Sequence, residues 1–243
     1  MENYFDKEFE LRYFETSKSG LATPATMLTL LEETAADHCY EINRSLFDLA
    51  NQNIGWVLAG GKMQINRYPA YKEKIVVRTW LSKYSTVKGI RENLIYDANK
   101  NIIGRAKGLW VFFDIQRRRP VQIFDDIIKK WSGSNEESII YDTSKKIDSV
   151  EIADYSHEFV VNLYDTDMYK HANNIKYLSW LIESLPEEII DNYYLHSIKG
   201  NFISEAKFGD TIQSLTKLIN DNTFLHTIKI KNSNKVCATA KTV

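Results

Sequence analysis

The densest group of side chains that could do chemistry lies in the segment DTDMYKHANN, residues 165–174. Asp167 and His171 supply a carboxylate and an imidazole, two groups commonly used for proton transfer near neutral pH. Asn173 or Asn174 can cap the helix expected to follow, whose first backbone N–H groups suit a developing negative charge on oxygen. The alternative is a turn rich in Asp and Asn that carries a solvated histidine.

A third candidate, Glu205, follows an expected strand over residues 198–204. A glutamate at a strand end is commonly a solvated charge, but this one has apolar neighbours at Phe202, Ile203 and Phe208. Burial among them would raise the pKa of its carboxyl towards working pH, as a general base requires. Glu205 is therefore a candidate base.

Each half of the chain combines one amphipathic helix with a run of strands. Thr23 and Pro24 predict the start of a helix over residues 24–40, whose apolar residues share one face. Strand-like segments follow at 56–58, 62–67, 75–81, 89–97 and 102–114. The second half repeats this order, with a strand at 157–164, a helix at 173–184 and strands at 198–204, 211–219, 223–231 and 235–243. One helix followed by an antiparallel meander predicts the α+β class.

The two halves align with each other at low identity. Setting Glu32 against Glu183, an offset of 151 residues, superimposes the apolar positions of the two helices. Setting Glu73 against Asp210, an offset of 137, superimposes later strands. A single helix wrapped by a curved antiparallel sheet, made twice, predicts a tandem (double) hot-dog architecture whose two sheets pair edge to edge.

The first half lacks the polar residues of the second. At these offsets Ser17 stands opposite Met168, Gly20 opposite His171 and Tyr68 opposite Glu205. This asymmetry predicts one active and one degenerate half. The expected boundaries are an N-terminal hot-dog over residues 1–131, a polar linker over 132–155 and a C-terminal hot-dog over 156–243 that carries the catalytic residues.

Composition excludes several classes of protein. The 243 residues carry 31 Lys and Arg against 32 Asp and Glu, and this near-neutral balance argues against a nucleic-acid binder. No apolar run approaches the roughly 18–20 residues of a membrane span, and the acidic start, MENYFDKEFE, has no signal-peptide pattern. Two cysteines and scattered histidines give no metal-ligand spacing, and no glycine-rich phosphate loop occurs. We therefore expect no membrane association, no metal, no cofactor and a cytoplasmic location.

Four segments, in order along the chain, resemble one family. DTDMYKHANNIKYLSWLIES is similar to the signature D-x-D-x-N-x-H-x-N-N-x-K-Y followed by a W-I-x-E-S helix. TMLTLLEETAADHC, GRAKGLWVFFDIQRRRP and ISEAKFGDTIQSLT resemble further segments of the same family. The family is that of the plant-type and bacterial fatty acyl-ACP thioesterases, where ACP is acyl carrier protein.

The resemblance implies a double hot-dog enzyme that hydrolyses the thioester of fatty acyl-ACP and so ends chain elongation. It implies catalytic roles for Asp167, His171 and Glu205, and supporting or oxyanion-binding roles for Asn173, Asn174 and Tyr169. Tyr169 departs from the family, which usually has a catalytic asparagine there. Ala206 stands where many members carry a cysteine, which argues against a Cys–His–Asn mechanism. Attack by a carboxylate and attack by an activated water both stay open.

The resemblance also implies sites for the two ends of the substrate. An apolar slot in the N-terminal half would hold the acyl chain, and its lining candidates, which could equally be plain core, are Met63, Ile65, Trp80, Trp110 and Phe112. ACP is acidic, so Arg117, Arg118 and Arg119 are candidates for its docking, or else a solvated face. We expect a monomer or homodimer and, since no transit peptide is seen, a bacterial enzyme.

Other activities compete with this one. The same fold could act on acyl-CoA, although no basic pocket for the CoA 3′-phosphate is visible as a motif. A hot-dog dehydratase and a cysteine hydrolase using Cys39 beside His38 are weaker alternatives, the latter because a helix C-terminus disfavours a thiolate. A non-catalytic acyl-binding module is an alternative of a different class, kept open by Tyr169.

Overall fold

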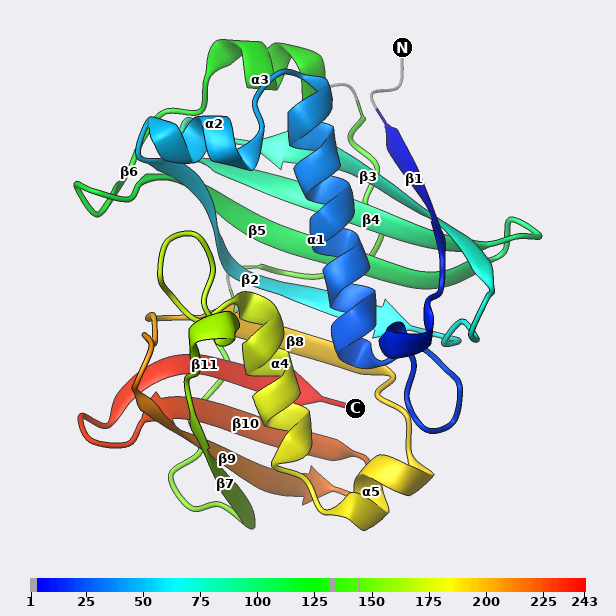
Figure 1. The fold of residues 1–243 in the computed structure, drawn as a ribbon, viewed down its shortest axis with the longest axis vertical. Coiled ribbons are helices and arrows are strands. Elements are labelled where there is room, and N and C mark those ends of the chain that lie inside the picture. Colours follow the sequence, from blue (N-terminus) through cyan, green and yellow to red (C-terminus); the bar gives the residue numbers. More distant parts are fainter. Residues whose placement is uncertain (1–3, 132–133, 144) are drawn as a thin grey trace. The chain divides into compact units, whose positions relative to one another are not determined.

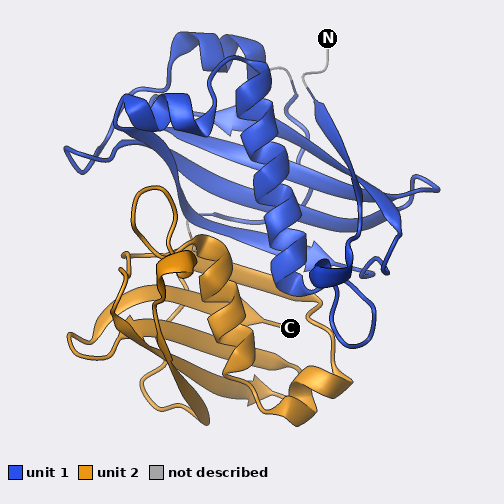
Figure 2. Cartoon of the chain, viewed as in Figure 1, with its two compact units in different colours: residues 1–143 blue, residues 144–243 orange. Residues whose placement is uncertain are grey.

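The computed structural model describes residues 4–131, 134–143 and 145–243. The chain forms two compact units, residues 1–143 (unit 1) and 144–243 (unit 2), which Figure 2 shows in different colours. Within the described ranges, no helix is both long enough and apolar enough to cross a membrane.

Unit 1 is a long helix, α1 (Pro24–Glu41), lying against an antiparallel sheet in the order β1-β3-β4-β5-β2 (Figure 1). The expected N-terminal cap is confirmed, because the Thr23 hydroxyl accepts a hydrogen bond from the Thr26 N–H at 3.0 Å. The strands are β1 (Phe5–Glu10), β2 (Ile54–Ile65), β3 (Lys74–Tyr84), β4 (Lys88–Asp97) and β5 (Ile102–Asp114), with the short β6 (Arg119–Pro120) beside β5. The remaining elements are the 3₁₀ turn η1 (Tyr13–Glu15) and the helices α2 (Leu46–Asn51) and α3 (Asp125–Trp131).

Unit 2 repeats this plan with a shorter helix. Its helix, α4 (Asn174–Glu183), buries Tyr177, Trp180 and Leu181. The sheet order is β8-β11-β10-β9-β7. Its strands are β7 (Tyr155–Val160), β8 (Ser197–Phe202), β9 (Thr211–Asn220), β10 (Thr223–Ile230) and β11 (Lys235–Thr242), and it also contains the 3₁₀ turn η2 (Leu163–Asp165) and the helix α5 (Glu187–Asn192). The α+β class is confirmed.

The structure differs from the expected elements of unit 1 in two places. Segments 56–58 and 62–67 are one strand, β2, because a bulge between Leu58 and Gly60 lets the chain continue its pairing with β5. The edge strand β1 was missed, although its alternation of exposed and half-buried residues is a strand pattern.

The repeat extends to individual hydrogen bonds, with a register that corrects the alignment of the helices. Isolated bridges join Thr16 to Ala22 in unit 1 and Thr166 to Ala172 in unit 2, an offset of 150 rather than 151. The helix caps Thr23 and Asn173 share this offset. The later offset of 137 holds, because the bridge of Leu21 to Ala70 matches that of His171 to Lys207.

The corrected register changes which residues correspond. Ser17 is the counterpart of Asp167, and Leu21, not Gly20, is the counterpart of His171. Gly20 corresponds instead to Lys170, and both have a positive φ, 75° and 63°. The counterpart of Glu205 is Tyr68, as expected from the offset of 137. Unit 1 therefore reproduces the backbone of the loop with Ser17, Leu21 and Tyr68 in place of Asp167, His171 and Glu205.

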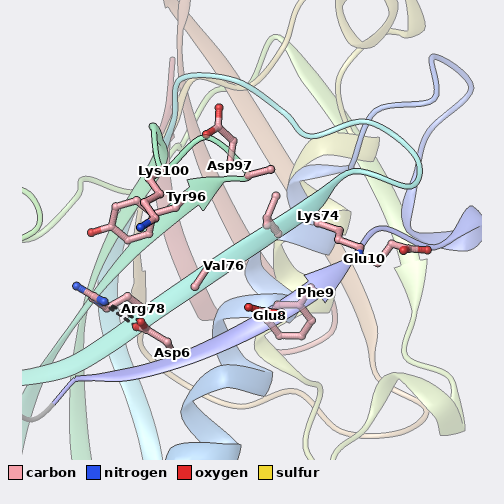
Figure 3. A pocket seen from close by; sticks show the side chains of 12 residues that line it. Asp6, Glu8, Phe9, Glu10, Lys74, Val76, Arg78, Tyr96, Asp97 and Lys100 are labelled. Carbon is pink, nitrogen blue, oxygen red and sulfur yellow. Dashed lines mark hydrogen bonds and ion pairs between the residues drawn. The ribbon is translucent and has the colours of Figure 1, made fainter.

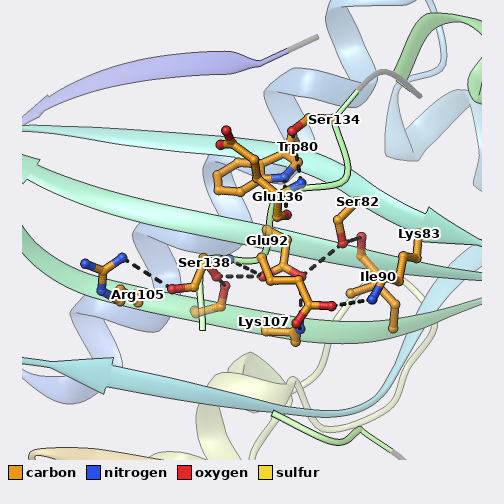
Figure 4. A network of polar contacts seen from close by, with 12 residues as sticks. Trp80, Ser82, Lys83, Ile90, Glu92, Arg105, Lys107, Ser134, Glu136 and Ser138 are labelled. Atoms are coloured by element: carbon orange, nitrogen blue, oxygen red, sulfur yellow. Dashed lines mark hydrogen bonds and ion pairs between the residues drawn. The ribbon is translucent and has the colours of Figure 1, made fainter. Parts of the chain in front are cut away.

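The described part of the expected linker is held against both units. In unit 1 the buried carboxylate of Glu92 accepts hydrogen bonds from the Ser138 N–H at 3.0 Å and the Ser138 hydroxyl at 2.6 Å (Figure 4). The buried Lys107 ammonium lies 3.3 Å from the same carboxylate. In unit 2 the Val150 N–H donates to the Thr227 hydroxyl at 2.7 Å.

Candidate active site

The side chains of His171 and Glu205 meet within unit 2. His171 Nε2 lies 3.3 Å from Glu205 Oε2, with 15% of the histidine side chain and 32% of the glutamate side chain exposed. His171 is in the loop that precedes α4, and Glu205 is in the connection between β8 and β9. The backbone bridge between His171 and Lys207 holds these two segments together.

Asp167 completes this group from the other side of the same loop. Its Oδ1 accepts hydrogen bonds from the backbone N–H groups of Tyr169 at 2.8 Å and His171 at 3.3 Å. Burial raises the pKa of the Asp167 carboxyl, and the charge of Glu205 adds to this, while the two N–H bonds and His171 act in the opposite direction. The loop is therefore a turn rich in Asp and Asn, as the alternative expected. The same turn also carries the catalytic candidates Asp167 and His171.

The helix start supplies fewer free donors than expected. The Asn173 carboxamide oxygen caps α4 by accepting from the Ile175 N–H at 2.9 Å. The Asn173 N–H itself donates to the Asp165 carbonyl at 2.9 Å, so it cannot serve as an oxyanion donor in this conformation. The Asn174 N–H, at the first helical position, has no hydrogen-bond partner among the described residues and is the donor that stays available.

Tyr169 and Ala206 are the two positions that depart from the family signature, and the structure defines the contacts of both. Tyr169 is half-buried, and its backbone takes part in the Asp167 turn. Ala206 is fully buried, with its N–H donating to the Tyr177 hydroxyl at 3.0 Å. The supporting or oxyanion-binding role expected of the Tyr169 side chain stays a prediction.

Neither cysteine is placed as a nucleophile. Burial raises the pKa of the Cys39 thiol to about 11, and burial lowers the pKa of the neighbouring His38 to about 2. The His38 Nδ1 accepts a hydrogen bond from the buried Arg91 guanidinium at 3.2 Å. Burial likewise raises the pKa of the Cys237 thiol. A protonated thiol beside an engaged histidine argues against the cysteine hydrolase alternative.

The acyl-lining candidates divide between the two faces of the unit 1 sheet. Phe112 packs with Cys39 of α1 and Leu49 of α2, on the helix-facing side. Met63 and Ile65 are buried, and Trp110 is partly exposed. Trp80 points to the opposite face, where its indole N–H donates to the Glu136 carbonyl at 3.0 Å (Figure 4). Trp80 and Phe112 therefore lie on opposite faces of the sheet, and one slot on a single face cannot contain both.

The three candidate docking arginines are exposed and lie at the turn from β5 into β6. The Arg117 N–H donates to Asp114 Oδ1 at 2.8 Å, which stabilises the turn, and Arg118 has a φ of 57°. Arg119 begins β6. Their exposure is compatible with docking and equally with a solvated turn.

A separate open hollow of about 810 Å³ lies on unit 1, lined by residues of β1, β3 and β4 and the turn after β4 (Figure 3). Its Arg78 guanidinium is paired with the Asp6 carboxylate at 2.7 Å. None of the candidate site residues lines it. Within the described ranges, no group of three or more His, Cys, Asp or Glu side chains could hold a metal ion.

Comparison with known proteins identifies the family. The model of the acyl-ACP thioesterase N-terminal domain matches residues 2–131, and that of the C-terminal domain matches residues 145–243. The fold is that of a double hot-dog protein. The chain belongs to the acyl-ACP thioesterase family.

Individual relatives agree with this assignment. The chain is 26% identical over 233 residues to the chloroplastic oleoyl-acyl carrier protein thioesterase of Coriandrum sativum, covering 86% of this chain and 61% of the relative. It is 29% identical over 212 residues to the chloroplastic palmitoyl-acyl carrier protein thioesterase of Cuphea hookeriana, covering 80% of this chain and 50% of the relative. The chain thus spans between half and about six-tenths of these curated relatives.

A solved structure shows the same fold over nearly the whole chain. The acyl-ACP thioesterase from Bacteroides thetaiotaomicron superimposes with a TM-score of 0.89 at 20% identity, covering 99% of this chain and 97% of that one. The expected tandem hot-dog architecture is confirmed.

Proposed function

We propose that this protein hydrolyses the thioester bond of fatty acyl-ACP, releasing a free fatty acid and ending chain elongation. The observation that carries the proposal is the 3.3 Å contact between His171 and Glu205, whose counterparts in unit 1 are Leu21 and Tyr68. A duplicated backbone that has the histidine and its carboxylate partner in one copy only fits a catalytic site in that copy. The family membership supplies the substrate class.

The proposed reaction uses an activated water. The His171–Glu205 pair accepts a proton as the water oxygen bonds to the thioester carbon. The Asn174 N–H donates to the carbonyl oxygen as its negative charge develops, aided by the positive end of α4. The C–S bond then breaks, and the proton held by the pair passes to the leaving thiolate. Asp167 fixes the backbone of His171 through its Oδ1.

We assign acyl-chain binding to the N-terminal hot-dog (1–131) and catalysis to the C-terminal one (156–243). Met63, Ile65, Trp110 and Phe112 are the proposed lining, and Arg117–Arg119 the proposed contact with the acidic carrier. A cytoplasmic setting is proposed because Cys39 and Cys237 are buried free thiols, as is usual in reducing compartments. Cell fractionation and light scattering after gel filtration test the location and the choice between monomer and homodimer.

The proposal is tested by hydrolysis of a panel of acyl-ACP and acyl-CoA thioesters. The wild-type protein should turn over acyl-ACP, and His171→Ala should reduce kcat at least about 100-fold. His157→Ala, which removes an exposed histidine from β7, is the control and should retain kcat. Turnover confined to acyl-CoA would reassign the carrier. Binding of acyl chains without any turnover would establish the acyl-binding alternative.

A further inference from the structure

A buried hydrogen bond behind the candidate site joins α4 to the segment that carries Glu205. The Tyr177 hydroxyl accepts a hydrogen bond from the Ala206 N–H at 3.0 Å. Tyr177 is 3% exposed, and its ring packs edge-to-face on Trp180 and Phe202, with centroids 5.4 and 5.7 Å away. The phenol is therefore fixed by packing before its hydroxyl meets the backbone.

This bond acts on the residue next to Glu205. The Ala206 N–H is held by Tyr177, and the Ala206 carbonyl accepts from the Ala172 N–H at 2.9 Å. Ala172 follows His171 directly, just as Ala206 follows Glu205. Ala206, hydrogen-bonded through both its N–H and its carbonyl, thus links the backbone next to Glu205 to the backbone next to His171.

Unit 1 shows that the fold itself does not need the bond. The counterpart of Tyr177 is Met27, which has no hydroxyl, and the counterpart of Ala206 is Pro69, which has no N–H. The other bond of the pair is kept, because the Ala22 N–H donates to the Pro69 carbonyl at 2.8 Å. Donor and acceptor are both absent from the copy that also lacks the histidine and the carboxylates.

We propose that Tyr177 is a positioning residue that, through the Ala206 N–H, holds Glu205 at hydrogen-bonding distance from His171. This deepens the proposed function and rests on it. The Tyr177 ring touches neither substrate nor the reacting atoms in this account; it acts through the backbone.

The ionisation of the phenol supports the proposed geometry. Burial raises the pKa of the Tyr177 hydroxyl, so the group stays neutral at working pH. A neutral phenol can accept the Ala206 N–H on a lone pair while directing its own proton towards the Cys237 thiol, with which it also interacts.

A double-mutant cycle on acyl-ACP hydrolysis tests the bond from both ends. Tyr177→Phe removes the acceptor and keeps the ring, while Ala206→Pro removes the donor and copies Pro69 of unit 1, where the same backbone accommodates proline. Each variant should lower kcat about 10- to 100-fold with KM changed less than about 2-fold, since small displacements of catalytic groups have effects of this size. The kcat of the double variant should be no lower than that of the less active single variant, because the two changes remove the same interaction.

The control is Tyr193→Phe, which removes a hydroxyl from an exposed tyrosine of unit 2, and it should retain kcat within about 2-fold. Wild-type kcat in Tyr177→Phe would overturn the proposal. A double variant whose loss equals the product of the two single losses would also overturn it, since independent effects multiply.

A readout without substrate separates this proposal from the proposed function. The ring ¹H–¹⁵N signals of His171 should move in Tyr177→Phe and Ala206→Pro and stay in place in the control Tyr193→Phe. Unmoved His171 signals overturn the positioning role whatever the activity. Moved signals in a protein that hydrolyses no thioester would keep the positioning role and reject the hydrolase.

Discussion

A buried histidine in unit 2 should make the stability of this unit depend on pH. His226 lies on β10 with no exposed surface, between two threonine hydroxyls. Its Nδ1 is 2.8 Å from the Thr216 hydroxyl and its Nε2 is 2.7 Å from the Thr242 hydroxyl. Burial lowers the pKa of His226 from 6.5 to about 4.

The direction and size of the pH effect on the stability of unit 2 follow from that lowered pKa. Between pH 6.5 and about 4 the unfolded chain binds a proton at His226 and the folded unit resists it, so stability falls as the pH falls. Each pH unit in this window costs about 1.4 kcal/mol. Acidification from pH 7 to pH 4 should therefore remove about 3 kcal/mol through His226 alone.

Amide hydrogen exchange on β9 and β10, measured at several urea concentrations, reports the unfolding free energy of unit 2. His226→Gln removes the titration while keeping groups that can bond both threonines. The difference between wild type and His226→Gln should change by about 3 kcal/mol from pH 7 to pH 4, to the detriment of wild type. His157→Gln, at an exposed position of the same unit, is the control. A difference that stays constant with pH would refute the reasoning.

Three further substitutions test local features. Glu92→Ala should destabilise unit 1 by about 3 kcal/mol in urea unfolding, because it leaves the 5%-exposed Lys107 and the Ser138 N–H without this buried carboxylate. An unchanged midpoint of the urea transition would contradict this. Lys170→Gly should raise the thermal stability of unit 2 by up to about 1 kcal/mol, since φ is 63° there; a lowered melting temperature would count against it. Asn173→Ala should cost about 1 kcal/mol by removing the cap of α4, seen as faster amide exchange in its first turn, and unaltered exchange there would show that the cap is dispensable.

The main elements could be predicted because their signals are local. Thr23 and Pro24 mark the start of α1, and alternating apolar residues mark the strands of both meanders. The site candidates Asp167 and His171 could be found because they are close together in sequence. The contact of His171 with Glu205 was not predicted, since 34 residues separate them; the family resemblance only placed both among the catalytic candidates.

Other features depend on tertiary structure and could not be predicted from the sequence. Apolar periodicity tolerates a shift of one residue on a helix, so the true offset of 150 became visible only through the bridges of Thr16 and Thr166. The direction of Trp80 depends on strand register, because Trp80 pairs with Glu92 on the face covered by residues 136–138. The use of the Asn173 N–H by Asp165 depends on the path of the loop.

The central claim is that unit 2 holds the chemistry and that Glu205 is essential to it. The most direct test compares two variants at corresponding positions, Glu205→Gln in unit 2 and Tyr68→Phe in unit 1, by steady-state hydrolysis of acyl-ACP. We predict that Glu205→Gln lowers kcat at least about 100-fold while Tyr68→Phe stays within about 3-fold of wild type. Near wild-type kcat in Glu205→Gln, in a protein that hydrolyses acyl-ACP, would contradict the account.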